Sequence, residues 1–83
     1  MSDAEVRSEL PGTFYRSPAP GEPPFVQEGQ AVKAETVIGI IELMKQFNDV
    51  TAGVAGVLSA FSVTDGDAVD TDVTLALIAT GGN

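Results

Sequence analysis

The chain has 83 residues, and 43% of them are hydrophobic, which suits one small packed domain and exceeds what a disordered segment carries. Twelve acidic residues against four basic ones give a net charge of −8. This charge argues against nucleic acid and anionic membrane surfaces as partners, because both require basic patches. The sequence has neither Cys nor His, which excludes disulfides and thiol nucleophiles and removes the usual general base. We therefore expect no metal site.

Residues 1–10 contain no apolar signal-peptide core. The longest apolar run, residues 37–41, is too short to cross a bilayer and is interrupted by Gly39. These features predict a soluble, cytoplasmic domain with little catalytic equipment of its own.

Residues 11–14 resemble residues 55–58 at an offset of 44. Later segments repeat at an offset of 37, so the first half carries seven extra residues. They fall in residues 17–24, which hold four of the five prolines. Proline cannot donate a ladder hydrogen bond, so this segment is expected to lie outside the sheet. It is either a loop that covers a sheet edge or a functional arm.

The repeat itself covers residues 28–41. Residues 28–35 match residues 65–72, and residues 36–41 match residues 73–78, both at an offset of 37. Each copy has an acidic-Gly turn, a short Ala-Val segment, a second acidic turn and an apolar run of strand length. Two copies of this unit predict an all-β fold, a small sandwich or flattened barrel with pseudo-twofold symmetry.

Residues 42–47 join the two copies. Their residue types favour a helix, but the segment is only six residues long and leads into a strand-like stretch, residues 47–51. We predict a hairpin with Met44 and Lys45 near its tip, although the usual Asn-Gly or Asp-Gly turn pair is missing. The pseudo-symmetry places this tip at the end of the domain opposite the chain termini.

Three sequence motifs together resemble one known family. They are Gly-Thr-Phe-Tyr-Arg-Ser-Pro-Ala-Pro at residues 12–20, Phe25 with Glu-Gly-Gln-Ala-Val at residues 28–32, and Glu-Leu-Met-Lys at residues 42–45. Their order and spacing resemble the biotin carboxyl carrier proteins of acetyl-CoA carboxylase, a more specific signal than one short motif. The resemblance implies a flattened β-barrel of two four-stranded antiparallel sheets over residues 9–79, of the biotinyl/lipoyl type. It leaves residues 1–8 as a flexible N-terminal segment and residues 80–83 as a C-terminal tail.

The resemblance also implies a cofactor and the residues that handle it. Biotin is expected to be attached covalently to Lys45, whose amine can be acylated and whose long stem extends the reach of the cofactor. The hairpin recognised by a biotin protein ligase comprises Glu42, Leu43, Met44 and Gln46. The family usually has Ala at position 43 and Met at position 46, and we expect biotinylation to survive both changes. A protruding thumb that contacts biotin in the family corresponds to Ser17, Pro18, Ala19 and Pro20, with the Ser17 hydroxyl facing the ureido group.

The function implied is that of a non-catalytic carrier. Lys45 would carry carboxylated biotin between a biotin carboxylase and a carboxyltransferase, and such a carrier needs no nucleophile or base of its own. Two alternatives stay open. One is a lipoyl-type carrier domain, which shares the fold but typically presents Asp-Lys-Ala at the tip. The other is an unmodified β-barrel that binds or scaffolds partners, with Lys45 left free because Leu43 prevents recognition by the ligase.

The pattern also predicts the core and two special glycines. Gly29 and Gly66 are expected at positive φ, so valine at either position should be costly. The residues expected to supply much of the core are Val32, Val37, Ile38, Ile40, Val57, Val69, Leu75 and Leu77.

Overall fold

The structure is a computed structural model of the chain and describes residues 2–80. Within that range it consists of strands and connecting loops, and it has no helix with the length and apolar character needed to cross a membrane. The strands are β1 (Ser2–Arg7), β2 (Gly12–Tyr15), β3 (Ala31–Val32), β4 (Val37–Leu43), β5 (Gln46–Thr51), β6 (Gly56–Phe61), β7 (Ala68–Val69) and β8 (Thr74–Thr80).

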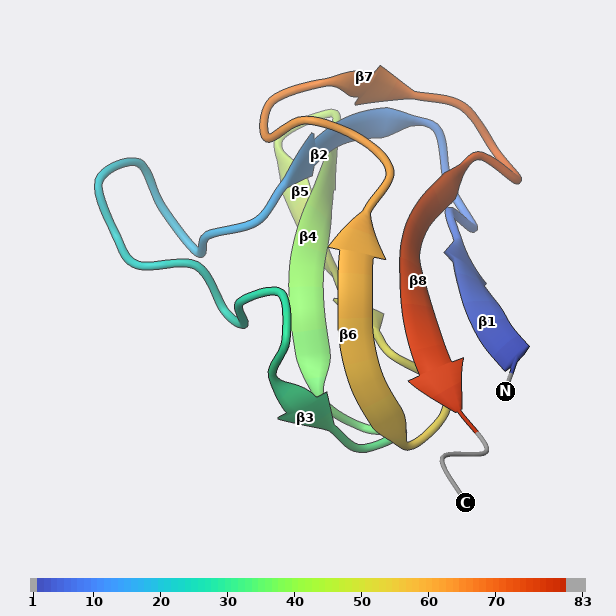
Figure 1. The fold of residues 1–83 in the computed structure, drawn as a ribbon. Helices are drawn as coiled ribbons and strands as arrows, with labels where there is room; N and C mark the ends of the chain where they lie inside the picture. The colour runs from blue at the N-terminus through green and yellow to red at the C-terminus, as the bar shows by residue number, and fades with distance from the viewer. Residues whose placement is uncertain (1, 81–83) are drawn as a thin grey trace.

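The strands form two four-stranded sheets that face each other (Figure 1). One sheet, here called the β8 sheet, has the order β1-β8-β6-β3, and the other, the β4 sheet, has the order β5-β4-β2-β7. Neighbouring strands run antiparallel throughout. The predicted fold class, a flattened sandwich of two four-stranded antiparallel sheets, is confirmed.

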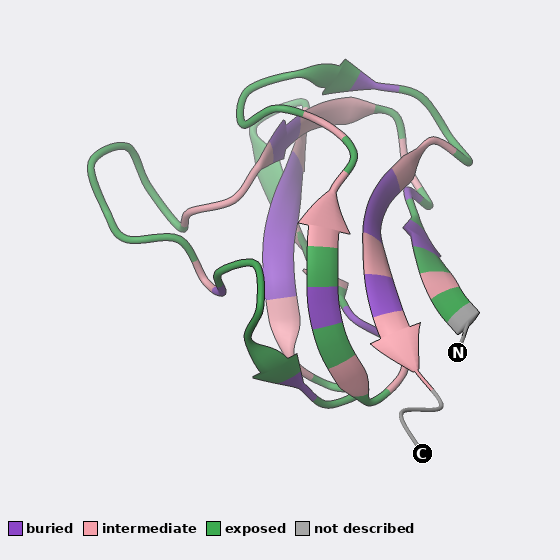
Figure 2. Ribbon diagram, in the orientation of Figure 1, coloured by how far each residue is buried: buried purple, intermediate pink, exposed green. Residues whose placement is uncertain are grey.

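The core lies between the sheets and divides into two clusters. The larger contains Ile38, Leu58 and Ile78, and the smaller is built around Phe14, Ile41 and Leu75, all of them at most 2% exposed. Figure 2 shows one buried position in the middle of β6 with an exposed one on either side, as the two-residue period of a strand requires.

The predicted core is confirmed only in part. Val32, Ile38, Val69 and Leu75 are buried in the two clusters, whereas Ile40 is buried but belongs to neither of them. Val37 and Leu77 are half-buried, and Val57 is 42% exposed, so its assignment to the core is wrong. The reason is the alternation along β6: Leu58 points inward and is fully buried, which turns its neighbour Val57 to the solvent.

The expected boundaries of the domain need correction at both ends. Residues 2–7 form β1, which pairs with β8 along its length, so this segment belongs to the β8 sheet instead of preceding the domain. Alternation explains the pairing: Ala4 and Val6 pack on the core, and the charged residues that alternate with them, Asp3, Glu5 and Arg7, are exposed. Thr80, expected in the tail, is the last residue of β8 and pairs with Ser2. Residues 1 and 81–83 of the two expected end segments lie outside the described residues.

The outer face of β1 carries a small polar network. The Glu5 carboxylate accepts a hydrogen bond from the Thr74 hydroxyl at 2.9 Å and forms an ion pair with Arg7, also at 2.9 Å. The Thr74 bond, followed by the bond and charge of Arg7, lowers the pKa of Glu5 below its ordinary value. Because the ionised form is favoured on folding, the small stabilisation is present near neutral pH and is lost as the pH falls through the lowered pKa.

The two repeats fold into matching turns. Gly29 has φ +93° in a turn closed by a bond from the Gln30 N–H to the Gln27 carbonyl, at 3.1 Å. Gly66 has φ +89° in a turn closed by a bond from the Asp67 N–H to the Thr64 carbonyl, at 3.0 Å. The predicted positive φ of both glycines is confirmed, and it belongs to a backbone region that β-branched residues avoid.

Replacing Gly66 by valine is expected to lower the free energy of unfolding by about 1–3 kcal/mol, because the new side chain must adopt a left-handed conformation. Urea unfolding followed by circular dichroism measures the change. Ala68→Val is the matched control, since Ala68 is exposed in the neighbouring strand β7 and a β-branched residue is compatible with a strand. Equal midpoints for the two variants would contradict the strain assigned to Gly66.

Candidate functional site

The tip of the β4–β5 hairpin is a two-residue turn formed by Met44 and Lys45. Leu43 pairs with Gln46 on either side of it, and both turn residues have left-handed backbone, with φ +54° for Met44 and +65° for Lys45. Positive φ at both central positions is the requirement of a type I′ turn, which Asn-Gly normally satisfies. Each non-glycine residue held there costs about 1–2 kcal/mol. The predicted hairpin is confirmed, and its tip retains Met and Lys at a conformational cost, which suggests that these side chains serve another purpose.

The side chains at the tip face solvent. Met44 is 87% exposed and Lys45 is also exposed. No hydrogen bond or ion pair engages the Lys45 amine among residues 2–80. Figure 1 places the hairpin tip at the end of the sandwich opposite Ser2 and Thr80, which pair with each other, as the repeat predicted. The amine is therefore free for modification and stands well away from both ends of the described chain.

Two polar side chains brace the turn from the strands below it. The Glu42 carboxylate accepts a hydrogen bond from the Lys45 N–H at 3.0 Å. The Asn48 side-chain amide donates to the Ile41 carbonyl at 3.3 Å and to the Gln46 carbonyl at 3.5 Å. Glu42, predicted as part of the ligase-recognised hairpin, thus stabilises the turn that presents Lys45.

Replacing Glu42 by alanine is expected to speed hydrogen exchange of the Lys45 amide about fivefold or more, because the amide loses its carboxylate acceptor. The midpoint of thermal unfolding should change little, since the bond is solvent-exposed. NMR-detected exchange measures the effect, and Asp49→Ala, which removes an exposed carboxylate from β5, is the control. Equal Lys45 exchange rates in the two variants would show that Glu42 does not hold the turn.

The Pro-rich segment connects β2 to β3 and projects from the sandwich as a loop without strands (Figure 1). At its tip, the Glu22 N–H donates to the Ala19 carbonyl at 3.1 Å around Pro20 and Gly21, and Gly21 has φ +80°. Proline followed by a residue at positive φ is the signature of a type II turn. At the base, the Phe25 N–H donates to the Arg16 carbonyl at 2.8 Å, so the loop is closed on itself.

A groove of about 530 Å³ lies between this loop and the outer face of the β4 sheet. On the sheet side, Tyr15 and Ile40 pair across β2 and β4, and Glu42 and Phe47 pair across β4 and β5. On the loop side it is lined by Ser17, Pro18, Ala19, Pro20 and Gly21, and Asp65 completes it. The walls are mainly apolar, with two hydroxyl-bearing residues and two carboxylate-bearing ones, a composition typical of small-molecule sites.

The groove brings together all four predicted thumb residues and one residue of the hairpin. Ser17, Pro18, Ala19, Pro20 and Glu42 line it, whereas Leu43, Met44, Lys45 and Gln46 do not. Lys45 itself does not line the groove, but Glu42 and Phe47 of the same hairpin do.

Sequence analysis missed three groove residues on the sheet, Tyr15, Ile40 and Phe47, and also Asp65 in the turn between β6 and β7. Ile40 was expected in the core, but a Cβ built on its neighbour Gly39 would meet the buried Phe14 ring at 2.5 Å. Gly39 therefore faces inward, and Ile40 faces the outer side, where it is only 5% exposed. Strand alternation through residues 39–42 was the signal that would have placed Ile40 and Glu42 on one outer face.

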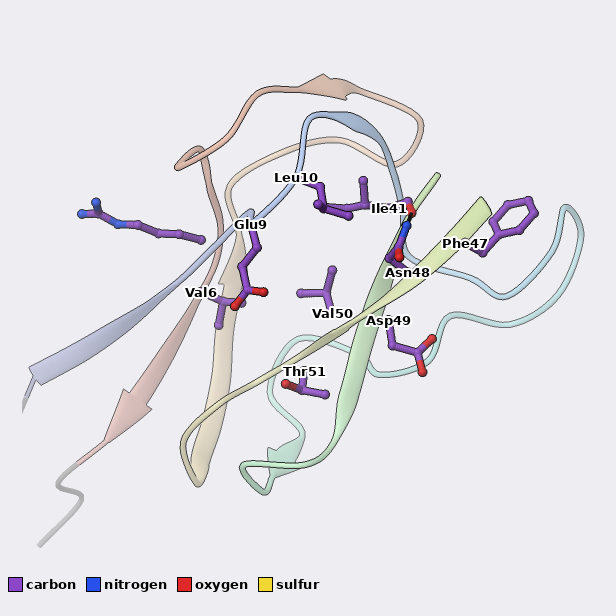
Figure 3. Close-up of a pocket in the computed structure, with 10 residues that line it drawn as sticks. Val6, Glu9, Leu10, Ile41, Phe47, Asn48, Asp49, Val50 and Thr51 are labelled. Carbon is purple, nitrogen blue, oxygen red and sulfur yellow. Dashed lines mark hydrogen bonds between the residues drawn. The ribbon is translucent and has the colours of Figure 1, made fainter. Parts of the chain in front are cut away.

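A second groove, also of about 530 Å³, opens between the edge strands β1 and β5 and contains none of the predicted site residues (Figure 3). Val6, Leu10, Ile41 and Val50 point into it, and Phe47 and Asp49 point to the other side of β5. Phe47, which is 64% exposed, lines both grooves. It is therefore the aromatic side chain that the hairpin presents beside Lys45.

Comparison with known proteins identifies the family. The family model described as "Biotin-requiring enzyme" matches residues 4–78, which is most of the chain. The chain belongs to this family. The match includes the hairpin, the Pro-rich loop and both repeats, and it begins within β1.

Two relatives and one solved structure agree with this assignment. The chain is 47% identical over 78 residues to the biotin carboxyl carrier protein of acetyl-CoA carboxylase from Haemophilus influenzae, covering 94% of this chain and 50% of the relative. It is 43% identical over 77 residues to the protein of the same name from Porphyra purpurea, covering 93% and 49%. The chain thus spans about half the length of these relatives. Its fold matches part of the Kluyveromyces lactis urea carboxylase with a TM-score of 0.79 and 26% identity, covering 95% of this chain and 6% of that one.

The comparisons confirm the resemblance proposed from the sequence motifs. The family description and the names of the relatives refer to biotin, in agreement with the cofactor predicted for this chain. The names also describe a carrier protein, in agreement with the expected non-catalytic role. The roles of individual residues stay predictions.

Proposed function

We propose that this domain is the biotin carrier of an acetyl-CoA carboxylase-like enzyme, with biotin attached through an amide bond to the Lys45 amine. The observation that carries the proposal is the free, exposed lysine held by two left-handed residues at the tip of a braced hairpin. Biotin attached there supplies the group-transfer chemistry, and the protein supplies presentation.

The residues present fit a biotinyl group. The Lys45 stem adds reach to the arm, and the hairpin fixes its starting point next to the groove of about 530 Å³. Tyr15, Ile40 and Phe47 offer apolar surface for the body of a bicyclic ring. Ser17 lines the same groove, and we propose that its hydroxyl hydrogen-bonds the ureido group. We assign the loop of residues 17–24 as a thumb that shelters the ring between transfers.

The partners follow from this role. We propose that a biotin protein ligase modifies the hairpin through Glu42, Leu43, Met44 and Gln46. We also propose that the loaded arm then visits a biotin carboxylase and a carboxyltransferase. Tethering makes both visits effectively intramolecular, so neither enzyme needs to bind the domain tightly. The cytoplasmic location and the lack of nucleic-acid or membrane partners, expected from composition, stay predictions.

The lipoyl alternative is less well supported. It shares the hairpin lysine, but the relatives described above are named as biotin carriers, and Gln46 stands where lipoyl domains typically have Ala. The unmodified-scaffold alternative requires that Leu43 block a ligase. Leu43 is half-buried in the closing pair of the turn, below the exposed Met44 and Lys45 that a ligase would meet first.

Intact-mass measurement after treatment with a biotin protein ligase, ATP and excess biotin tests the proposal. We expect a single biotinyl increment, and we expect the modified domain to accept a carboxyl group from biotin carboxylase supplied with ATP and bicarbonate. An increment produced only by a lipoate ligase would support the lipoyl alternative instead. No increment from either ligase, in a folded protein, would support the unmodified scaffold.

A further inference from the structure

The loop of residues 17–24 is stiff, so contacts at its base decide where it lies. Four of its eight residues are proline, which fixes φ at each of these positions. Its tip is closed by the turn at Pro20 and Gly21, and its base by the bond between Phe25 and Arg16. A loop of this kind moves as a unit about its base instead of bending along its length.

The base is held by residues from the second half of the chain. The Arg16 N–H donates to the Asp65 carboxylate at 2.6 Å, a bond between residues 49 positions apart. The Arg16 guanidinium carbon lies 4.1 Å from the centroid of the Phe61 ring, within the range of a cation–π contact. The Arg16 Nε is buried and has no hydrogen-bond partner within residues 2–80. Stacking on Phe61 is therefore the contact that fixes this side chain.

A similar contact, in which a turn carboxylate accepts a backbone hydrogen bond from the other half of the chain, occurs at Glu28. Glu28 precedes Asp65 by the repeat offset of 37 and accepts a hydrogen bond from the Phe61 N–H at 2.9 Å. The first acidic turn residue of each repeat thus fixes a strand end in the other half: Glu28 the end of β6, and Asp65 the residue after β2. Only β2 continues into the Pro-rich loop, and Asp65 also lines the groove.

We propose that Asp65, together with the stacked pair Arg16 and Phe61, clamps the base of the loop and holds it over the outer face of the β4 sheet. Asp65 is then a positioning residue, which acts through the loop on whatever occupies the groove. The identification of the occupant as the biotin ring rests on the function proposed above. The clamp does not depend on that function.

The clamp is tested first in the unmodified chain. In Asp65→Ala, hydrogen exchange of the Phe25 amide is expected to accelerate about tenfold or more, because its acceptor, the Arg16 carbonyl, is released together with the loop base. The heteronuclear NOE values of Ser17, Ala19, Gly21 and Glu22 should fall with it. Phe25 does not contact the Asp65 carboxylate through any hydrogen bond in residues 2–80, so its exchange reports the clamp and not merely the deleted bond.

Two matched variants complete this test. Asp70→Ala removes the same charge and the hydrogen bond that the Asp70 carboxylate accepts from the Thr71 N–H at 2.9 Å. Asp70 does not line the groove, so this variant should leave the loop unchanged. Asp65→Asn keeps an acceptor oxygen and should return the Phe25 exchange rate to within about threefold of the wild type. Loop exchange and NOE values in Asp65→Ala equal to those in Asp70→Ala would overturn the clamp.

The second test uses the biotinylated chain. Biotinylation of the wild type is expected to shift the amide signals of Ser17, Ala19 and Gly21, and Asp65→Ala should reduce these shifts by at least half while those of residues 44–46 persist. Shifts of full size in Asp65→Ala would overturn the positioning role. If no ligase modifies Lys45 in any variant, the proposed function fails, and the exchange measurements on the unmodified chain still decide the clamp.

Discussion

Replacing Lys45 by arginine is expected to abolish biotinylation completely while leaving the fold intact. Arginine keeps the positive charge and the long stem, but its guanidinium is not an amine that a ligase can acylate. Lys45 is exposed, and its side chain has no polar partner within residues 2–80, so its loss removes no contact that stabilises the sandwich. Intact mass after ligase treatment should show the full increment in the wild type and none in the variant.

Lys33→Arg is the matched control, because Lys33 is the other lysine of the chain and is also exposed. It lies after β3, in a turn closed by a bond from the Thr36 N–H to the Lys33 carbonyl at 3.0 Å, and arginine leaves this backbone contact in place. The control should be biotinylated like the wild type. A biotinyl increment that persists in Lys45→Arg and disappears in Lys33→Arg would assign the attachment site to Lys33 instead.

The hairpin could be predicted from the sequence because topology outweighed local propensity. A six-residue helix between two strands would bury little and would separate β4 from β5, whereas a turn pairs them over their full lengths. The unusual conformation of the turn was also foreseeable, since a tight hairpin requires positive φ even where Asn and Gly are absent. What the sequence did not reveal was the Glu42 side chain that stabilises it, because many exposed glutamates have the same local pattern.

The position of the Pro-rich loop along the chain could be predicted from the sequence, but its orientation relative to the sheet could not. Its position followed from the different offsets of the two halves, and the turn at Pro20 and Gly21 is one that this dipeptide favours. Its base, however, depends on Asp65, which is 49 residues away from Arg16. Contacts at such separation leave no local signature, and an Asp-Gly pair in a turn is equally typical of a residue that only faces solvent.

The errors in the core and at the N-terminus have a common origin in strand alternation. Val57 and Leu58 are adjacent and similarly apolar, and only the register of β6 against β8 decides which of them is buried. In β1, two small apolar residues between charged ones gave a weak signal, and β1 has no counterpart in the repeat. In strands this short, an alternating pattern identifies the buried residues only when the partner strand and its register are known.

Replacing Phe14 by alanine is expected to lower the free energy of unfolding by about 3–5 kcal/mol, a large fraction of the total for a domain of this size. Phe14 is fully buried in the smaller core cluster, with its ring centroid 6.0 Å from that of Phe61. Its ring also fills the space above Gly39, which has no side chain of its own to occupy the cavity left by the substitution. Urea unfolding measures the loss.

Phe47→Ala provides the comparison, since the same side-chain change on the exposed β5 should cost less than about 1 kcal/mol. Phe14→Leu keeps most of the volume and should lie between the two, which preserves the test if Phe14→Ala does not fold. Because Phe14 belongs to β2 and contacts Phe61 of β6, its loss loosens the contact between the halves that also supports the Pro-rich loop. A destabilisation by Phe14→Ala no larger than that by Phe47→Ala would contradict this packing.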